Sequence, residues 1–523
     1  MIRDLSGFPV SIQEIATDVL VIGAGIAGLL VATRLARAGR RVVVAESGGH
    51  TQIGETHPLN EVEQVGEIYS GAEHGRFRCL GGTSTRWGGA MLPFQPADLA
   101  PHPAGWNIDW PIALDELTVY QSEIERLFKL GTGPYDCPEL MLGRGGAPAA
   151  FMGRLAKWPP FRLRNVAKLL ADDIQSKNGP EVWLNATATS FAFGPAGRLE
   201  SVKVRSNNGS VLSVIARETI VAAGAIESTR LLLLADRQHD DRIFASDAVL
   251  GRYFHDHLSA PTARLANVRR IALNRVVGFR FEGATMRNLR FEPTTDLREE
   301  RKIPAGFVHI AFRTDKVTGF DALRDVYRKI QRREPPSAQD VVALASGTPW
   351  LLRAVWWRLV EKRLLFPDAV HLDVHIVIEQ EPRFDNRIAL SPRRVDRYGC
   401  PLATIDWRVH DGDAANVKAT TEAFAEAWNG SRLADLARIE PNIPADLKHA
   451  LTQGGGIWHP GGSARMGSDA SRGVVDGELR AFRVPNLSVV STATFPTGGG
   501  ANPTMMLMMA ALRTADRIAR QFK

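Results

Sequence analysis

Residues 18–46 read DVLVIGAGIAGLLVATRLARAGRRVVVAE, and this stretch decides the fold of the N-terminal part of the chain. The apolar run at 18–22 predicts a buried strand, the apolar residues of 26–38 recur at helical spacing, and 41–45 predicts a second strand. A strand, a tight glycine turn, a helix and a strand form a β-α-β unit. This unit predicts an α/β fold built on a parallel sheet.

The turn carries the pattern GxGxxG, with glycines at 23, 25 and 28. Such glycines permit the tight turn, let the backbone approach a pyrophosphate, and let the helix pack against the strand, with the helix N-terminus facing the phosphates. Glu46 ends the second strand, where a carboxylate can accept hydrogen bonds from ribose hydroxyls, although a solvated acid is the alternative. The motif predicts dinucleotide binding without separating FAD from NAD, and its predicted contacts are Gly23, Gly25, Ile26, Ala27, Gly28 and Glu46.

Three further motifs are rich in small residues. LGGTSTRWGG at 80–89 lets backbone press against a flat ring, and HPGGSARMG at 459–467 places His459 before a glycine loop. GANPTM at 500–505 places Asn502 before the last predicted helix, 503–521. A lone histidine is more often structural than catalytic, but the position of His459 before this loop favours a functional role.

The composition excludes several classes of function. The 523 residues carry a net charge of +7, and their Lys and Arg are scattered, which disfavours nucleic-acid binding. Three cysteines without a CxxC pair favour reduced thiols over disulfides or a zinc site, and no metal site is predicted. The N-terminus lacks a signal-peptide pattern, and no uninterrupted apolar stretch has the length of a membrane span. We therefore expect a bacterial-type chain in the cytoplasm.

The four motifs, in this order and spacing, resemble those of the glucose–methanol–choline (GMC) oxidoreductase family. AAGAIES at 222–228 and LGRYF at 250–254 also fit the family, whereas the resemblance is looser between 260 and 440. The resemblance implies a Rossmann-like FAD-binding domain with an inserted α+β substrate domain built on an antiparallel sheet. The segments that it implies are 1–95, 161–262 and 454–523 for the FAD-binding domain, 96–160 for a lid or connection, and 263–453 for the substrate domain.

The resemblance also implies the chemistry. The family oxidises CH–OH groups by hydride transfer to flavin N5, with His459 matching the general base and Asn502 matching a residue that orients the substrate. His257, in the pair Asp256–His257, competes as a functional histidine, but we expect a structural role for it. The further FAD contacts that the resemblance implies are Gly82, Thr83, Arg86, Trp87, Gly88, Gly89, Ala223, Ala493, Asn502, Pro503 and Thr504.

Within the family, the sequence most resembles the pyranose oxidases and bacterial sugar dehydrogenases. Arg86 stands where covalent members of that branch carry a flavin-linked histidine, so FAD is expected to be non-covalent. Gly88 stands where pyranose oxidase has a threonine, which favours a dehydrogenase over an oxidase. The expected substrate is a sugar or glycoside, and the expected electron acceptor is oxygen or a quinone-like molecule. A polyol, steroid or choline-like alcohol and a non-redox flavin-dependent lyase are the alternatives.

Two regions have ambiguous roles. Glu379 and Gln380 either contact a sugar or are only the polar end of a strand. Residues 340–366 mix Trp, Leu and Val with Arg, and we expect a lid, a subunit interface or core packing there. Peripheral contact with a membrane surface is the less favoured interpretation of the same pattern.

Overall fold

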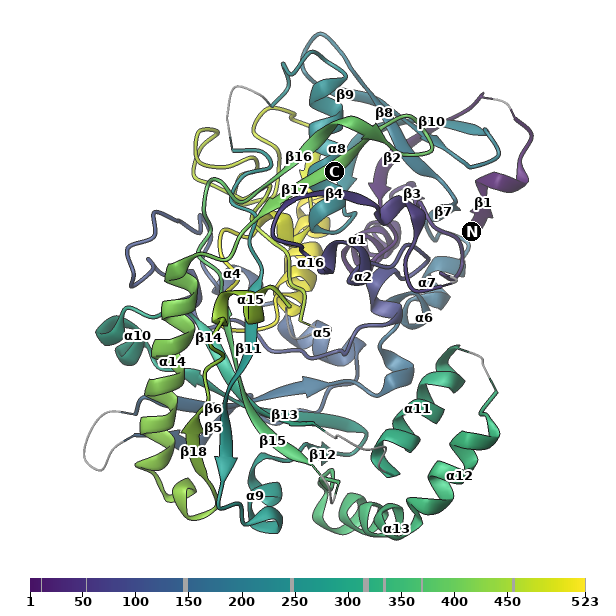
Figure 1. Ribbon diagram of the computed structural model, residues 1–523. Coiled ribbons are helices and arrows are strands. Elements are labelled where there is room, and N and C mark those ends of the chain that lie inside the picture. The colour runs from purple at the N-terminus through teal and green to yellow at the C-terminus, as the bar shows by residue number, and fades with distance from the viewer. Residues whose placement is uncertain are drawn as a thin grey trace.

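The computed structural model describes residues 1–523 with the exception of 11, 53, 144–148, 245–248, 314–318, 333–334, 368–369, 454–456 and 523. Two large sheets organise these residues, and they lie one above the other in the view of Figure 1. The upper sheet is mainly parallel and the lower sheet is antiparallel. This arrangement confirms the predicted fold class.

The strand predicted at 18–22 lies in the middle of the upper sheet. This strand is the C-terminal part of β2 (Ile12–Ile22), which pairs in parallel with β3 (Val42–Ala45) and β10 (Val211–Val221). Helix α1 (Ile26–Arg37) packs on these strands and against the last helix, α16 (Thr504–Gln521), so Val19–Ile22 is almost fully buried. The other strands are β1 (Ile2–Asp4), β7 (Glu181–Leu184), β8 (Thr187–Phe193), β9 (Leu199–Arg205) and β19 (Leu487–Val489).

Two predicted elements differ from the structure. The apolar pattern of the sequence predicts two strands, at 211–215 and 218–223, but the structure has one strand there, β10, because its whole length pairs with β2. The pattern at 166–177 predicts one helix, but the structure has two, α6 (Val166–Leu169) and α7 (Ala171–Gln175), because Leu170 leaves helical geometry with φ −101° and ψ 16°. Tertiary pairing and one local bend therefore override the periodicity of the sequence.

The antiparallel sheet has a core face and an opposite face. Val374, Ile376 and Ile378 of β15 (His371–Glu379) join the core under α14 (Asp411–Asn429), as does Phe291 of β13 (Thr285–Pro293). Side chains alternate along a strand, so Arg290, Phe307, His309, His375 and Glu379 project from the opposite face, called here the site face. The other strands are β5 (Asp136–Leu142), β6 (Phe151–Trp158), β11 (His257–Ala266), β12 (Arg280–Glu282), β14 (Gly306–Arg313) and β18 (Arg438–Pro441).

At two places the expected domain segments divide strands that belong to one sheet. The segment expected as a lid or connection at 96–160 contains β5 and β6, two strands of the antiparallel sheet. The boundary expected between 262 and 263 falls inside β11, which pairs with β15 on both sides of that point. Hydrogen bonding between distant segments determines which strands share a sheet. The order of residues along the chain does not reveal this pairing.

A small third sheet joins β4 (Val62–Gly66), β16 (Arg387–Val395) and β17 (Pro401–Trp407) and contacts α8 (Ala225–Arg237). No helix among the described residues is both long enough and apolar enough to span a bilayer. The remaining helices are α2 (Gly71–His74), α3 (Pro96–Leu99), α4 (Asp115–Thr118), α5 (Gln121–Leu127), α9 (Arg270–Val277), α10 (Thr295–Arg301), α11 (Gly319–Arg332), α12 (Ala338–Ser346), α13 (Thr348–Trp356) and α15 (Leu447–Thr452).

The glycine turn after β2 gives a matched pair of substitutions. A Cβ on Gly28 would lie 1.9 Å from the carbonyl oxygen of Gly23, whereas a Cβ on Gly25 would meet nothing within 4 Å. We expect Gly28→Ala to lower the thermal unfolding midpoint by about 5 °C or more, because the helix must move off the strand. Gly25→Ala should leave the midpoint of the cofactor-free protein within about 2 °C, measured by differential scanning fluorimetry. Equal midpoints for the two variants would contradict this account.

Candidate active site

The first glycine loop leaves open space at a helix N-terminus. Gly23 has φ +106°, in the left-handed region, and Gly25 is the N-cap residue of α1 without a side-chain cap. A Cβ on Gly25 would meet no atom within 4 Å. An open helix N-terminus with uncapped N–H groups suits the pyrophosphate of a dinucleotide. The geometry of these residues therefore fits the cofactor that the sequence implies.

Glu46 at the end of β3 holds the glycine loop in place. Its carboxylate oxygens accept the N–H groups of Ala24 and Gly48, both at 2.8 Å. Burial raises the pKa of Glu46, although these hydrogen bonds oppose the rise. The ribose contact stays a prediction, and the observed hydrogen bonds give this carboxylate a structural role as well.

The second glycine-rich segment lies directly against the first. The N–H of Gly81 donates to the carbonyl oxygen of Ala24 at 2.9 Å, and a Cβ on Gly82 would lie 2.9 Å from the Cα of Gly25. The Trp87 indole N–H donates to the carbonyl oxygen of Arg164 at 2.8 Å, which fixes this segment on the protein. Three predicted cofactor contacts in this segment are exposed, namely Thr83, Arg86 and Gly88, while Gly82 and Gly89 are buried.

The C-terminal motifs reach the same region. The carbonyl oxygen of Ala222, next to Ala223, would lie 2.6 Å from a Cβ on Gly23. Ala493 is fully buried, and Pro503 is the N-cap residue of α16, which begins at Thr504 and packs along α1. Motifs that are almost 500 residues apart in the sequence therefore surround one part of the upper sheet.

His459 and Asn502 meet next to this region. The distance between His459 Nε2 and Asn502 Nδ2 is 3.1 Å, although 43 residues separate them along the chain. Arg290 Nη2 donates to Asn502 Oδ1 at 2.6 Å. Because this oxygen accepts from Arg290, the amide group of Asn502 directs its N–H toward the imidazole.

A chain of hydrogen bonds determines which nitrogen of His459 carries the proton. His257 Nε2 contacts the carbonyl oxygen of Gly499 at 2.8 Å, and a carbonyl only accepts, so Nε2 is the protonated nitrogen. His257 Nδ1 is then an acceptor for the Nδ1–H of His459 at 3.3 Å. The Nε2 of His459 keeps its lone pair, which faces Asn502 and can take a proton.

Burial keeps both imidazoles neutral. The pKa of His459 lies well below its usual 6.5, first because burial disfavours the imidazolium and then because His257 and Arg290 lie nearby. Burial also lowers the pKa of His257. Above its lowered pKa, His459 is in the neutral form that a general base needs.

A buried carboxylate, Asp256, holds the backbone of both histidines. Its Oδ1 accepts the N–H of His459 at 2.5 Å and the N–H of His257 at 2.6 Å. Its Oδ2 accepts the hydroxyl of Tyr69, whose ring packs edge-on against Phe254 and Trp407. Burial raises the pKa of Asp256 to about 7. This carboxylate therefore connects three distant segments at the base of the site.

A second buried carboxylate, Glu379, fixes the turn that precedes Asn502. Its oxygens accept the N–H of Gly499 at 2.8 Å and the N–H of Ala305 at 2.9 Å, and its side chain lies 3.4 Å from His102 Nε2. Asp98 accepts the N–H of Gly500 at 3.2 Å. The structure therefore supports the strand-end interpretation of Glu379 over contact with a sugar, and it assigns Glu379 a structural role.

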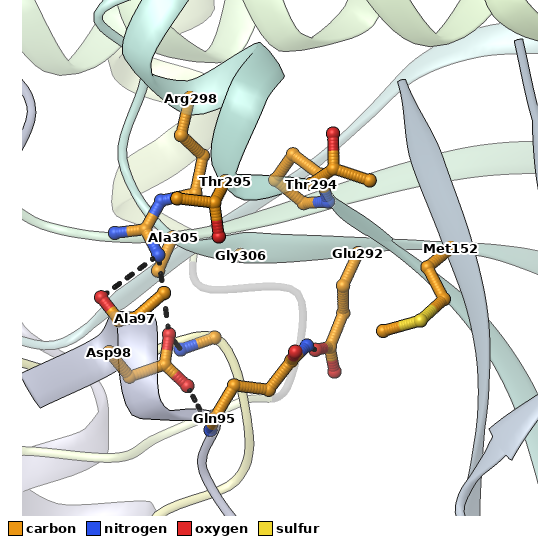
Figure 2. A pocket seen from close by; sticks show the side chains of 12 residues that line it. Gln95, Ala97, Asp98, Met152, Glu292, Thr294, Thr295, Arg298, Ala305 and Gly306 are labelled. Atoms are coloured by element: carbon orange, nitrogen blue, oxygen red, sulfur yellow. Dashed lines mark hydrogen bonds and ion pairs between the residues drawn. The ribbon is translucent and has the colours of Figure 1, made fainter. Parts of the chain in front are cut away.

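Gly500 of this turn helps to line a small pocket. Figure 2 shows that Asp98 and Arg298 approach each other in this pocket and that Gln95 lies beside Glu292. Its volume is about 30 Å³, which is enough for roughly two water molecules. An alcohol of sugar size does not fit there. The pocket is therefore part of the support for the Gly498–Gly500 turn, and His459 and Asn502 remain the candidates for the site chemistry.

Sequence reasoning missed several residues of this site. Asp256, Arg290 and Tyr69 carry no motif, although the pair Asp256–His257 was visible as a candidate. The side chain of Gln380 donates to the carbonyl oxygen of Arg408 and accepts from Trp407, so it serves the fold. Among the described residues, no group of three or more His, Cys, Asp or Glu is placed to hold a metal ion.

Two family models match parts of the chain. Residues 382–511 match the family described as GMC oxidoreductase, and residues 17–246 match the family described as pyridine nucleotide-disulphide oxidoreductase. The first match contains His459 and Asn502, and the second contains the glycine loop and Glu46. The two matches therefore cover the two halves of the site described above.

Relatives and solved structures align over nearly the whole chain. The 2-methyl-1,2-propanediol dehydrogenase of Mycolicibacterium austroafricanum is 25% identical, and the alignment covers 97% of this chain and 96% of the relative. The paromamine 6'-oxidase of Streptomyces fradiae is 23% identical over 96% of this chain and 91% of the relative. The crystal structure of pyridoxine 4-oxidase from Mesorbium loti shares the fold, with TM-score 0.55, 15% identity, and coverage of 96% of this chain and 99% of that chain.

The protonation pattern of the two histidines can be tested directly. In ¹⁵N-histidine-labelled protein at pH 7, NMR should show His459 protonated at Nδ1 and His257 protonated at Nε2. His257→Leu removes the acceptor, so the single form of His459 should give way to a mixture. His449→Ala, on exposed α15, should leave the His459 signals unchanged. An Nε2-protonated His459 in the unsubstituted protein would contradict the hydrogen-bond chain.

Proposed function

Because the chain belongs to the GMC oxidoreductase family, whose FAD-dependent enzymes act on alcohol groups, we propose that it oxidises a CH–OH group with His459 as general base. The contact between His459 Nε2 and Asn502 Nδ2 carries this proposal. FAD supplies the hydride acceptor when bound. The residues that would hold it are those of the glycine loop, Glu46, 82–89, Ala223, Ala493 and 502–504.

The two side chains offer complementary groups to an alcohol oxygen. His459 Nε2 has a lone pair, and the Asn502 amide directs an N–H toward the same place. An alcohol oxygen that replaces this direct hydrogen bond, with the two side chains further apart, can donate its O–H to Nε2 and accept the amide N–H. The proton then moves to His459, while the amide N–H of Asn502 donates to the oxygen and stabilises the negative charge that develops on it. Base catalysis of this kind contributes typically about a hundred- to ten-thousand-fold.

We propose a sugar or a sugar-containing compound as the substrate. The relative named paromamine 6'-oxidase supports a substrate of this kind, whereas the relative named as a diol dehydrogenase supports the polyol alternative. A polyol, steroid or choline-like alcohol is the alternative within the same chemistry. Anaerobic mixing with free sugars, glycosides, aminoglycosides and polyols tests the proposal, because substrate oxidation bleaches the visible absorption of the flavin. A lyase would leave the flavin oxidised with its own substrate.

The second glycine-rich segment supports two finer proposals. Arg86 cannot form the flavin–histidine bond of covalent relatives, so we propose non-covalent FAD, which acid precipitation would release into the supernatant. Gly88 offers no hydroxyl beside the cofactor, which favours a dehydrogenase that uses a quinone-like acceptor over an efficient oxidase. Reoxidation rates with oxygen and with a soluble quinone would separate these two modes.

The role of His459 gives the central test. His459→Ala should slow the anaerobic reduction of bound flavin by at least about a hundredfold while FAD stays bound, because the alcohol proton loses its acceptor. Stopped-flow absorbance measures the rate, and the spectrum of the purified variant measures FAD content. His449→Ala is the matched control and should reduce the flavin at the unsubstituted rate. A near-normal rate in His459→Ala would contradict the assignment of the base.

A further inference from the structure

Arg290 on β13 brings a buried cation to the catalytic pair. The residue is 2% exposed and projects from the site face of the antiparallel sheet. Its Nη2 donates to Asn502, and its guanidinium stacks on the ring of Phe307, 3.8 Å from the ring centroid. Its Nε and Nη1 are buried and have no hydrogen-bond partner among the described residues.

The carboxylates near Arg290 are committed to other partners. Glu292 pairs with Arg154 at 2.8 Å, Glu379 accepts two backbone N–H groups, and Asp98 lies 3.6 Å from Arg298. No ion pair of Arg290 within 4 Å occurs in the part of the chain that the structure describes. Burial lowers the pKa of Arg290, and Glu292 raises it in part from beyond this distance. A buried charge without a counter-ion in direct contact is unfavourable, so the site is suited to a ligand that supplies one.

His309 on β14 adds a second polar group beside Arg290. Its Nδ1 is also buried without a hydrogen-bond partner. Burial lowers the pKa of His309 to about 3, with further lowering by His375 and Arg290, so the imidazole is neutral. The pKa of Arg290 falls only to about 10, so this guanidinium keeps its charge at neutral pH.

We propose that Arg290 and His309 form a binding subsite for a carboxylate, and that the preferred alcohol therefore carries an acid group. The inference rests on the proposed function and narrows its substrate to hydroxy acids, such as sugar acids. A guanidinium matches a carboxylate because it can present two parallel N–H donors to the two oxygens. Asn502 takes only one of the two N–H groups of Nη2. The other Nη2–H and the unpartnered N–H beside it, on Nε or on Nη1, remain as such a pair.

Matched pairs of alcohols test the subsite. D-gluconate and D-glucitol differ only in a carboxylate or hydroxymethyl terminus, as do D-glycerate and glycerol. The acid of a pair should reduce the flavin at least about tenfold faster than the neutral partner. Arg290→Met should abolish this ratio, and Arg290→Lys should keep part of it. Asn502→Ala frees Arg290 without removing its charge, so it should slow both members of a pair and keep the ratio.

A binding measurement separates failure of the subsite from failure of the proposed function. Acetate should perturb the visible spectrum of the oxidised flavoprotein in a saturable way, and Arg290→Met should lose this response. If no alcohol reduces the flavin but acetate binds through Arg290, the proposed function fails and the subsite stands. If neutral alcohols react as fast as acids, or if the ratio survives in Arg290→Met, the subsite is wrong. A spectrum that acetate leaves unchanged in the unsubstituted protein would also overturn the subsite.

A different observation concerns the helices α11, α12 and α13, here called the helical arm. Figure 1 shows them as a group beyond the ends of β12 and β15. The inner side of α13 and of the π-helical turn Trp357–Glu361 packs through Trp350 and Trp357. The outer side is also apolar, with exposed fractions of 51–70% at Leu352, Val355, Trp356, Leu359 and Val360.

The exposed residues of the arm have the spacing of one helix face. Positions 352, 355, 356, 359 and 360 follow i, i+3, i+4, i+7 and i+8, and Val341 and Val342 on α12 are exposed as well. A helix that is apolar on both sides normally buries both. The stripe therefore marks a surface that another molecule or a membrane covers.

The charge of the helical arm indicates which kind of surface it binds. Residues 319–363 contain nine basic and five acidic residues, a net charge of +4 out of +7 for the whole chain. Of the acids, Asp340 is paired with Lys329 at 2.6 Å and Glu361 with Arg275 at 2.7 Å, while Arg353 and Lys362 are exposed next to the apolar stripe. Apolar insertion combined with positive charge matches an anionic lipid surface.

We propose that the helical arm docks on an anionic membrane surface, with the stripe at the lipid boundary and the basic side chains toward the headgroups. This proposal reverses the preference inferred from residues 340–366 alone, because the stripe is exposed while a separate apolar side of α13 packs in the core. The arm would keep the enzyme at the membrane without spanning it.

Sedimentation with vesicles tests the arm on the intact flavoprotein. The protein should pellet with vesicles of 70% phosphatidylcholine and 30% phosphatidylglycerol, stay in solution with pure phosphatidylcholine, and be released by high salt. The triple substitution Leu352→Ser, Trp356→Ser and Leu359→Ser should reduce the pelleted fraction at least about fivefold. Ile68→Ser, which alters an exposed apolar residue outside the arm, is the control and should bind normally. Equal pelleting by the triple variant, or a stripe-dependent dimer that does not bind vesicles, would overturn the proposal.

Discussion

The geometry of the site depends on one buried carboxylate. Asp256 accepts the backbone N–H groups of His257 and His459 and the hydroxyl of Tyr69, and so connects the N-terminal, central and C-terminal parts of the chain. Burial of a carboxylate is unfavourable unless its oxygens accept hydrogen bonds, and three donors satisfy this requirement here. The same hydrogen bonds fix the backbone from which His459, the proposed base, projects. The hydrogen bonds of Asp256 therefore stabilise the interior and also fix the positions of the two histidines.

The electrostatics of the site follow from burial as well. A low-dielectric environment keeps His257 and His459 neutral, so a chain of single-proton hydrogen bonds from Gly499 to Asn502 has one consistent arrangement. Burial also lowers the pKa of Arg290, but only to about 10, so the guanidinium stays charged at neutral pH. In the proposed reaction, neutral His459 accepts the proton while the cation Arg290 lies near the negative charge that develops on the substrate oxygen.

The antiparallel sheet serves two purposes through the alternation of its side chains. One face of β13, β14 and β15 packs against α14, and the other carries Arg290, His309 and Glu379. The proposed carboxylate subsite thus consists of residues whose neighbours in sequence are fixed in the core, which limits their movement. The helical arm lies at the edge of this sheet, so association with a membrane surface would leave the catalytic pair undisturbed.

The sequence by itself determined the parallel sheet, the glycine loop and the family motifs, because these features depend on local patterns such as Gly23–Gly28 and on residue types at fixed spacing. It also indicated His459 and Asn502 through the family resemblance. Tertiary structure alone decided that β5 and β6 join the antiparallel sheet. It also decided that Asp256, His257 and Arg290 lie beside His459 and Asn502. The exposure of the stripe on α13 was likewise invisible, because an apolar helix face predicts burial and does not name its partner. Each of these outcomes depends on contacts between segments far apart in the chain, which local periodicity does not encode.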